Sequence, residues 1–492
     1  MERYDVLVLG GGVLGCFAAR HLTRWGFRTA LLEGREDLCT GITRANTAII
    51  YTGCDTPPGT LKTRLCVEAN RTFDDLCAQL GVPFARPGSL MVSCGPRAQR
   101  VLERKLRQGQ ENGVPGLRLL SGAEARAMEP ELTEEVTGAL YAPGTGTVNP
   151  WELGLAAGEN AAANGCTIIL NAQVTALFSD GPDWGAETAR GTFRARAVVN
   201  CCGLYADKVQ ELVSEPSVRI FPGKAEYLVL DDTVDHAPRH ILFHEPEEKG
   251  KGLTVVPTVE GKLLLGPSEG PGADKDDWST TARGLDFLRT WTARVLPGLD
   301  LGKTIRSFGA IRPNPFYVHQ EGETWVREEK SIHNFTIQNP RPRFWSFLGI
   351  KTPGLTCADG LVRYVAGLVA EELGRKEPNP AFDPVRTPPV RVKELSFEAR
   401  AALIRQNPAY GKILCRCGEI TEGEVLDAIA RGAVTLDGVK RRAGTGLGRC
   451  QGSVCAGKVM ALLSRELKVP VENLRRDGPG TDWLGGNDRG TL

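Results

Sequence analysis

The chain has 492 residues, too many for one ordinary hydrophobic core, so we expect about two to four domains. Hydrophobic residues make up 41% and charged residues 24%, as in soluble globular proteins, and 60 basic residues nearly balance 59 acidic ones. This balance argues against a nucleic-acid partner or a polybasic membrane surface, and no apolar run approaches the ~20 residues that span a bilayer.

The N-terminal stretch YDVLVLGGGVLGCFAARHLTRWGFRTALLEGRE has the pattern of a dinucleotide-binding unit. Residues 6–9 suit a buried parallel strand, apolar residues then recur at helical intervals from Val13, and the second strand, TALLE, ends in Glu33. Small glycines let the backbone approach a pyrophosphate at a helix N-terminus, and Glu33 can accept hydrogen bonds from ribose hydroxyls. The glycines with G-x-G-x-x-G spacing are Gly10, Gly12 and Gly15. Because no charged leader precedes this first strand, we expect no signal peptide and a cytoplasmic location.

The acid at Glu33 would repel a 2′-phosphate, so the sequence predicts FAD or NAD rather than NADP. Three later segments resume the nucleotide fold. They are the hydroxyl-rich loop CTGITRANTAIIYTGCD at 39–55, the strand and glycine turn ARAVVNCCGLYAD at 195–207, and the turn and helix of 349–373. A fold that is interrupted and resumed in this way suits a long ligand that is covered from several sides.

The C-terminal region carries four cysteines in two tight pairs, after the proline-rich stretch GRKEPNPAFDPVRTPPVRVKE that we interpret as an extended linker. The pairs have C-x-C and C-x-x-x-x-C spacing: Cys415, Cys417, Cys450 and Cys455. A helix with Thr421 as its N-cap is expected between the pairs, and a second helix is expected to begin near Ala456. Four thiolates can hold one tetrahedral metal or a small iron–sulfur cluster. Zinc sites favour C-x-x-C pairs, which these are not, so from the residues alone an iron–sulfur cluster, zinc and a metal-free remnant all stay open.

Seven motifs in residues 1–375 resemble, in order, those of the D-amino-acid-oxidase superfamily of flavoproteins: GGGVLG, TRANTAIIYTGCD, GALYAPGTGTVNP, VVNCCGLYAD, GLTVVPTVEGKLLLGPSEG, GAIRP and GIKTPGLT. Within it, the chain is similar to the anaerobic glycerol-3-phosphate dehydrogenase large subunit and the L-2-hydroxyglutarate dehydrogenases. The cysteine-rich tail resembles the bacterioferritin-associated-ferredoxin-like [2Fe–2S] domain.

The resemblance implies an α/β fold that holds FAD in a discontinuous Rossmann-like domain, with an inserted α+β substrate domain and a small helical [2Fe–2S] domain. The expected boundaries are 1–85, 146–215 and 336–375 for the FAD domain, 86–145 and 216–335 for the substrate domain, 376–395 for the linker and 396–480 for the [2Fe–2S] domain.

The resemblance also implies contacts with the parts of FAD. The three glycines would meet the pyrophosphate, Glu33 the adenosine ribose and Val174 the adenine, while Gly203 closes the third nucleotide turn. The remaining contacts would be made by a loop beneath the flavin and by a turn that offers N–H groups to its carbonyl end. These residues are Thr43, Arg44, Ala45 and Asn46 in the loop, and Gly354, Leu355 and Thr356 in the turn.

On the substrate side, Arg312 in GAIRP matches the family arginine that binds a carboxylate or phosphate, and Lys351 would lie beside the flavin turn. Many relatives have a His at the position of Tyr51, so a covalent flavin link through imidazole is excluded here. We place Tyr51 in the catalytic set with Arg312 and Lys351. The strand KAEYLVLDD resembles a strand at the roof of the pocket, and His333 is a weaker candidate; the strand's polar residues are Lys224, Glu226 and Tyr227.

Taken together, the sequence predicts an FAD-dependent dehydrogenase that oxidises a CH–OH group of a small anionic substrate. Glycerol 3-phosphate is the first choice and a 2-hydroxy acid the second. A [2Fe–2S] cluster would pass single electrons to a partner redox subunit or a quinone-linked acceptor, with the enzyme held at the inner membrane face through that partner. The alternatives are an amine or amino-acid dehydrogenase subunit, and an electron-transfer subunit whose partner performs the chemistry.

Overall fold

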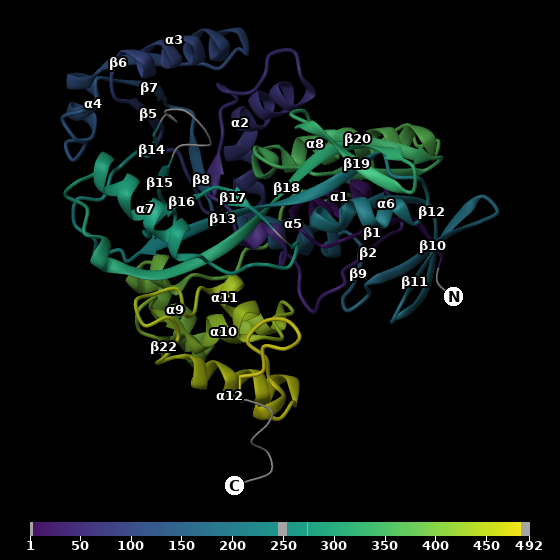
Figure 1. The fold of residues 1–492 in the computed structure, drawn as a ribbon. Helices are drawn as coiled ribbons and strands as arrows, with labels where there is room; N and C mark the ends of the chain where they lie inside the picture. The colour runs from purple at the N-terminus through teal and green to yellow at the C-terminus, as the bar shows by residue number, and fades with distance from the viewer. Residues whose placement is uncertain (1–2, 245–252, 273, 484–492) are drawn as a thin grey trace. The chain divides into compact units, whose positions relative to one another are not determined.

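The computed structural model describes residues 3–244, 253–272 and 274–483, which fold into two compact units (Figure 1). The first unit comprises Met1–Gly34 and Leu38–Arg386, and the second comprises Arg35–Asp37 and Thr387–Leu492. None of the described helices is long and apolar enough to cross a membrane.

An eight-stranded sheet carries the predicted nucleotide motifs. Its main path is β10 (Val174–Asp180), β11 (Asp183–Thr188), β12 (Gly191–Asn200), β1 (Arg3–Leu9), β2 (Thr29–Leu32) and β9 (Thr167–Ile169); β21 (Phe344–Leu348) pairs with β12 and with β20 (Thr336–Arg341). The pairs β1–β2, β1–β12, β2–β9 and β12–β21 are parallel, so strands that carry successive motifs end at one edge of the sheet. The predicted strands at 6–9 and TALLE are confirmed as β1 and β2.

Four helices build the core of this region: α1 (Val13–Arg24), α2 (Leu61–Leu80), α5 (Pro150–Ala163) and α8 (Gly354–Glu372). Helix α1 packs on α5 and α8, and α2 packs on α8, with small residues at the contacts. The helical interval from Val13 and the glycine-opened helix in 349–373 are confirmed as α1 and α8. A small three-stranded sheet has the order β3 (Ile49–Ile50), β8 (Gly146–Val148) and β4 (Phe84–Ala85).

A ten-stranded sheet is built around two long antiparallel strands, β13 (Val218–Leu230) and β18 (Thr304–Glu321), which Figure 1 shows side by side. Its path is β19 (Thr324–Ser331), β18, β13, β16 (Leu263–Gly266), β15 (Thr254–Pro257), β14 (Ile241–His244), β5 (Ser89–Ser93), β7 (Gly138–Ala142) and β6 (Arg118–Ser121), with β17 (Gly270–Pro271) on β13. Helices α3 (Pro96–Glu111) and α4 (Gly122–Met128) pack on the β5–β7 end, and α7 (Ala282–Val295) packs on β13 and β16. The α/β fold class is thus confirmed, while the division of this unit into FAD and substrate domains stays a prediction.

The second unit is small and mainly helical. Its elements are α9 (Phe397–Gln406), β22 (Ile413–Cys415), β23 (Ile420–Thr421), α10 (Glu422–Ala430), α11 (Leu436–Ala443) and α12 (Ala456–Leu467). Thr421 is the N-cap of α10 and forms a capping box with Glu424, and α12 begins at Ala456, so both helix predictions are confirmed.

The second unit also includes Arg35–Asp37, a short segment that is distant in sequence from the rest of that unit. The Asp37 carboxylate is 1% exposed and accepts hydrogen bonds from Arg441 at 2.8 Å and from Arg442 at 2.7 Å. Arg441 also pairs with Asp477 at 2.8 Å. Burial raises the pKa of Asp37, but the hydrogen bonds and charges of the two arginines outweigh burial and lower it. This buried ion-pair group therefore holds Arg35–Asp37 within the C-terminal unit.

Candidate active site and cofactor sites

The turn after β1 has the backbone geometry that a dinucleotide pyrophosphate requires. Gly10 has a φ of +92°, and a Cβ on Gly15 would lie 1.8 Å from the carbonyl oxygen of Gly10, so both positions require glycine for the fold itself. A Cβ on Gly12, by contrast, would meet only Thr43 Oγ1, at 3.4 Å. Gly12 is the N-cap residue of α1 and has no side chain to cap the helix, although Thr43 Oγ1 accepts a hydrogen bond from the N–H of Val13. The space above Gly12 is therefore left open in a way that fits a phosphate.

Glu33 is held where β2 ends. Its Oε2 accepts a hydrogen bond from the N–H of Gly11 at 2.6 Å, and its backbone bonds to Ile169 and Ala172 at 2.9 and 2.8 Å. The chain that continues from Ala172 starts β10 at Val174, so the predicted ribose and adenine contacts are brought to neighbouring places. Gly203 has a φ of +57° and begins the short 3₁₀ turn Gly203–Tyr205 that follows β12, while its part in nucleotide binding stays a prediction.

The loop predicted to lie beneath the flavin is fixed by its own polar side chains. Thr43 Oγ1 accepts a hydrogen bond from Val13 N–H at 3.0 Å, which joins the loop to the start of α1. The side-chain amide of Asn46 donates to the carbonyl of Thr43 at 2.9 Å, and Ala45 between them is buried. The guanidinium of Arg44 lies 5.0 Å from the ring centroid of Trp278.

The N-terminus of α8 meets the same region. Thr356 is 1% exposed, and its Oγ1 accepts a hydrogen bond from the N–H of Tyr51 at 3.0 Å. This contact joins the strand after the Thr43–Asn46 loop to the helix that begins at Gly354, with Leu355 partly buried beside it. The residues predicted for FAD thus come from segments that the fold connects, and their donor groups and glycine-lined space fit the cofactor.

Replacing Gly12 with Val should abolish FAD binding while leaving the fold intact, because the added methyl groups enter space that only a ligand needs. The ratio of flavin absorbance to protein absorbance, with circular dichroism as the folding check, measures this. Gly367→Ala is the matched control, since a Cβ there meets nothing within 4 Å. A Gly12→Val protein that purifies with a full complement of FAD would contradict the pyrophosphate assignment.

The substrate side of the site is positively charged. Arg312 lies on β18, and its guanidinium is 3.4 Å from the carboxylate of the half-exposed Glu269. Lys351 Nζ lies 3.5 Å from Asn314 Oδ1 and 3.4 Å from Ser331 Oγ. Burial, followed by the charges of Lys62 and Arg312, lowers the pKa of Lys351 to about 8. A fraction of Lys351 is therefore a neutral amine near physiological pH.

Tyr51 and Tyr227 are close enough to Arg312 to be influenced by its charge, but neither is a base. Burial raises the pKa of Tyr51 above its ordinary value despite a hydrogen bond to Thr47, and burial raises the pKa of Tyr227 to about 12, although Arg312 opposes both shifts. Both phenols stay protonated at neutral pH, so each can donate a hydrogen bond but cannot accept a proton as a base. Tyr227 stacks on Phe308 with 4.8 Å between ring centroids.

Three weaker sequence candidates have other roles in the structure. Lys224 is neutralised by Asp277 at 2.7 Å, and Glu226 is buried and accepts hydrogen bonds from Ser268 and from the N–H of Thr281. Glu226 therefore anchors the segment before α7 rather than facing a ligand. His333 is exposed in the connection between β19 and β20. The sequence interpretation also missed Lys62, a buried lysine whose charge reaches Lys351.

The four cysteines of the second unit meet as two pairs. The sulfurs of Cys417 and Cys450 lie 3.6 Å apart, and the thiols of Cys415 and Cys455 hydrogen-bond to each other. Backbone N–H groups of Gly446 and Gly418 also point to the Cys415 sulfur. In the described chain, no group of three or more His, Cys, Asp or Glu side chains is arranged to hold a metal ion. A mononuclear zinc site needs four ligands around one point, whereas two thiol pairs fit a binuclear cluster that takes two thiolates at each iron.

Comparison with protein families agrees with both parts of this geometry. Residues 5–368 match the model of the DAO family, "FAD dependent oxidoreductase". The chain belongs to this DAO family. Residues 413–465 match the "BFD-like [2Fe-2S] binding domain", and all four paired cysteines lie within this range. FAD and a [2Fe–2S] cluster are thus the cofactors of this DAO-family oxidoreductase, and the zinc alternative loses its support.

Relatives of this DAO-family chain include proteins named for glycerol 3-phosphate. A "Glycerol 3-phosphate dehydrogenase" of Caloramator mitchellensis is 37% identical, with 98% of each chain covered. An "Anaerobic glycerol-3-phosphate dehydrogenase subunit A1" of Haloferax volcanii is 25% identical over 94% of this chain and 83% of its own. Among solved structures, the FAD-bound L-alpha-glycerophosphate oxidase of Mycoplasma pneumoniae superposes with a TM-score of 0.72, at 24% identity over 80% of this chain and 100% of its own. The last similarity supports the fold.

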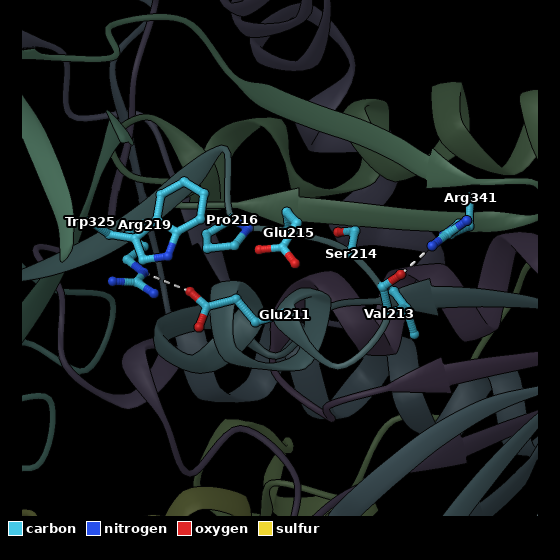
Figure 2. A pocket seen from close by; sticks show the side chains of 8 residues that line it. All are labelled: Glu211, Val213, Ser214, Glu215, Pro216, Arg219, Trp325 and Arg341. Atoms are coloured by element: carbon cyan, nitrogen blue, oxygen red, sulfur yellow. Dashed lines mark hydrogen bonds and ion pairs between the residues drawn. The ribbon is translucent and has the colours of Figure 1, made fainter. Parts of the chain in front are cut away.

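A surface pocket of about 380 Å³ lies away from these groups, between β13, β19, β20 and the end of α6 (Ala206–Glu211). Figure 2 shows Arg219 directed at Glu211, at 2.8 Å, and Arg341 donating to the carbonyl of Val213 at 3.0 Å. Arg219 and Glu211 form an ion pair within this pocket, and none of the predicted site residues lines it. We assign it no part in the oxidoreductase chemistry.

Proposed function

We propose that this chain oxidises the secondary hydroxyl of glycerol 3-phosphate and passes the electrons through its [2Fe–2S] cluster to a partner redox subunit or a quinone-linked acceptor. The observation that carries the proposal is the positive charge of Arg312 and Lys351 next to the α8 turn that FAD would contact. The 37% identical glycerol 3-phosphate dehydrogenase supports the choice of substrate. The word "subunit" in the name of the Haloferax relative supports a partner.

The roles of the residues follow from their chemistry. The planar fork of Arg312 binds two phosphate oxygens, and its weak 3.4 Å contact with the half-exposed Glu269 is easily exchanged for this stronger pair. Bound FAD supplies the acceptor for the hydride that leaves the secondary carbon. The neutral amine of Lys351 takes the hydroxyl proton, so that the C–O bond becomes a carbonyl and the product is dihydroxyacetone phosphate. Tyr51 donates a hydrogen bond and stabilises the developing oxygen charge.

A 2-hydroxy acid is the second candidate, because an arginine fork pairs equally well with a carboxylate. Mixing the isolated chain without oxygen with glycerol 3-phosphate, 2-hydroxy acids and amino acids separates the possibilities. Rapid loss of the visible absorbance of oxidised flavin with glycerol 3-phosphate is the expected result. Reduction by a hydroxy acid or an amino acid alone would overturn the choice of substrate. Reduction by none of them would favour an electron-transfer subunit.

Arg312→Lys should slow flavin reduction at low glycerol 3-phosphate about a hundredfold. The charge is kept but the bidentate fork is lost, at a cost of roughly 2–3 kcal/mol in binding and orientation. Stopped-flow measurement of the reduction rate against substrate concentration, with flavin and iron content checked, gives the result. Arg219→Lys, at the surface pocket of Figure 2, should leave the rate unchanged. Unaltered kinetics in the Arg312→Lys variant would indicate a neutral or amine substrate.

A further inference from the structure

Lys62 is a buried cation without an anionic partner in the described chain. It is the second residue of α2 and is 6% exposed. Its ammonium lies 5.3 Å from the ring centroid of Phe335, and its backbone N–H donates to Asn334 Oδ1 at 3.2 Å. Lysines are rarely buried unless paired, and a cation–π contact offsets only part of the cost of desolvation. The position therefore needs an anion that the described residues do not provide.

The surroundings of Lys62 place it at the substrate side of the site. Phe335 follows the β19 end residue Ser331, whose hydroxyl lies 3.4 Å from Lys351 Nζ. Besides burial, the charges of Lys62 and Arg312 are the main influences that lower the pKa of Lys351. Among the described residues, the carboxylates that act on these lysines are exposed: Asp55 acts on Lys62 together with the thiols of Cys357 and Cys66, and Glu269 acts on Lys351. The charges of Lys62 and Arg312 thus both reach Lys351, in a region where the described residues supply little compensating negative charge.

We propose that Lys62 is a second phosphate-binding cation, and that Lys62 and Arg312 together select a phosphate dianion over a singly charged carboxylate, with Lys351 beside them as the base. This inference rests on the proposed function and specifies how that site chooses its substrate. A phosphate monoester carries about 1.5 to 2 negative charges at neutral pH, and a carboxylate carries one. In a partly dehydrated site, a carboxylate would leave surplus positive charge uncompensated, whereas the dianion offsets most of it. Lys62 thus determines the preference for a phosphate ester over a hydroxy acid.

The test compares Lys62→Met, which removes the charge and keeps the apolar stem on Phe335, with Lys62→Arg, which keeps the charge. Lys262→Met is the matched control, because Lys262 is a similarly shielded lysine that is already paired with Asp232 at 2.9 Å. Two quantities are measured on the holoenzyme. They are the concentration of glycerol 3-phosphate that half-saturates anaerobic flavin reduction, and the dissociation constant of inorganic phosphate from its perturbation of the flavin spectrum.

Lys62→Met should raise both constants about thirtyfold, a loss typical of removing one partner from a buried charge pair, with a much smaller change in the limiting rate. Lys62→Arg should restore most of the affinity, and Lys262→Met should behave as the unaltered chain. In Lys62→Met, the preference for glycerol 3-phosphate over glycerate should fall by a similar factor.

Two outcomes are distinguishable. If the unaltered chain is reduced by glycerol 3-phosphate and Lys62→Met matches Lys262→Met in both constants, the Lys62 inference is wrong and the proposed function stands. If glycerol 3-phosphate does not reduce the unaltered chain, the proposed function fails, and equal phosphate affinity in the two variants would then refute the role of Lys62 as well. Should Lys62→Met not retain FAD, Lys62→Gln gives the same comparison with a polar terminus.

Discussion

Flavin reduction by saturating glycerol 3-phosphate should slow about 10²- to 10⁴-fold when Lys351 is replaced by Met, the range expected for losing a general base. The loss should appear in the limiting rate, because a base acts on the transition state and not on the bound ground state. Arg312 still holds the phosphate in this variant, so the half-saturating concentration should rise much less. Single-turnover reduction without oxygen measures both quantities.

The pH dependence provides an independent check of the same assignment. The pKa of Lys351 is lowered to about 8, so the base is protonated and inactive below this pH and neutral and active above it. The rate at low substrate should therefore rise with pH through about 8 and then level off, and Lys351→Met should lose this inflection. At saturating substrate the bound dianion favours the charged amine, so the inflection should move to higher pH. A Lys351→Met variant with an unchanged limiting rate and pH profile would exclude Lys351 as the base.

Cys450→Ser should remove the [2Fe–2S] cluster essentially completely while leaving flavin reduction by substrate unchanged. Cys450 forms one of the two thiol pairs, and a serine hydroxyl is a much poorer ligand for iron than a thiolate. Anaerobic analysis should find about two irons and two sulfides per chain in the unaltered protein and almost none in the variant. Electron delivery to a one-electron acceptor should fall with the cluster, because the reduced flavin then lacks its single-electron outlet.

The control for this substitution is Cys94→Ser, a change at a partly buried cysteine of the other unit, which should retain both cofactors. Zinc without sulfide in the unaltered protein would contradict the binuclear assignment. Loss of FAD along with the cluster would contradict the independence of the two cofactor sites.

The sequence predicted the nucleotide turns and the cysteine helices because their requirements are local. Gly10 and Gly15 are fixed by backbone conformation and close approach within a few residues, and the Thr421 cap lies three residues from its partner Glu424. Such signals are complete within one stretch of sequence. The strands β1 and β2 could also be predicted from the sequence, because a strand that is buried on both faces is a continuous apolar run.

The sequence could not predict the charge balance of the site, because that depends on residues brought together by the fold. Lys62 stands in LKTRLCVEANR, where a lysine looks like part of a solvated helix face, and only its packing on Phe335 buries it. Conversely, Lys224 and Glu226 resemble pocket residues in their own strand. In the fold, Asp277 neutralises the first, and the hydroxyl of Ser268 and the N–H of Thr281 donate hydrogen bonds to the second.

Because Arg35–Asp37 belong to the C-terminal unit, they affect both the order in which this unit can fold during synthesis and where the chain can be cut into fragments. Synthesis delivers Asp37 early, but its partners Arg441 and Arg442 leave the ribosome near the end, so the C-terminal unit cannot be completed until almost the whole chain exists. A fragment that starts at Thr387 would also lack this anion and leave two shielded guanidinium groups uncompensated. The C-terminal unit therefore does not consist of residues 387–492 alone, and it cannot be moved to another protein as a continuous stretch of chain. Its transplantation to another flavoprotein would require an acid to be introduced at the position of Asp37, four residues after Glu33.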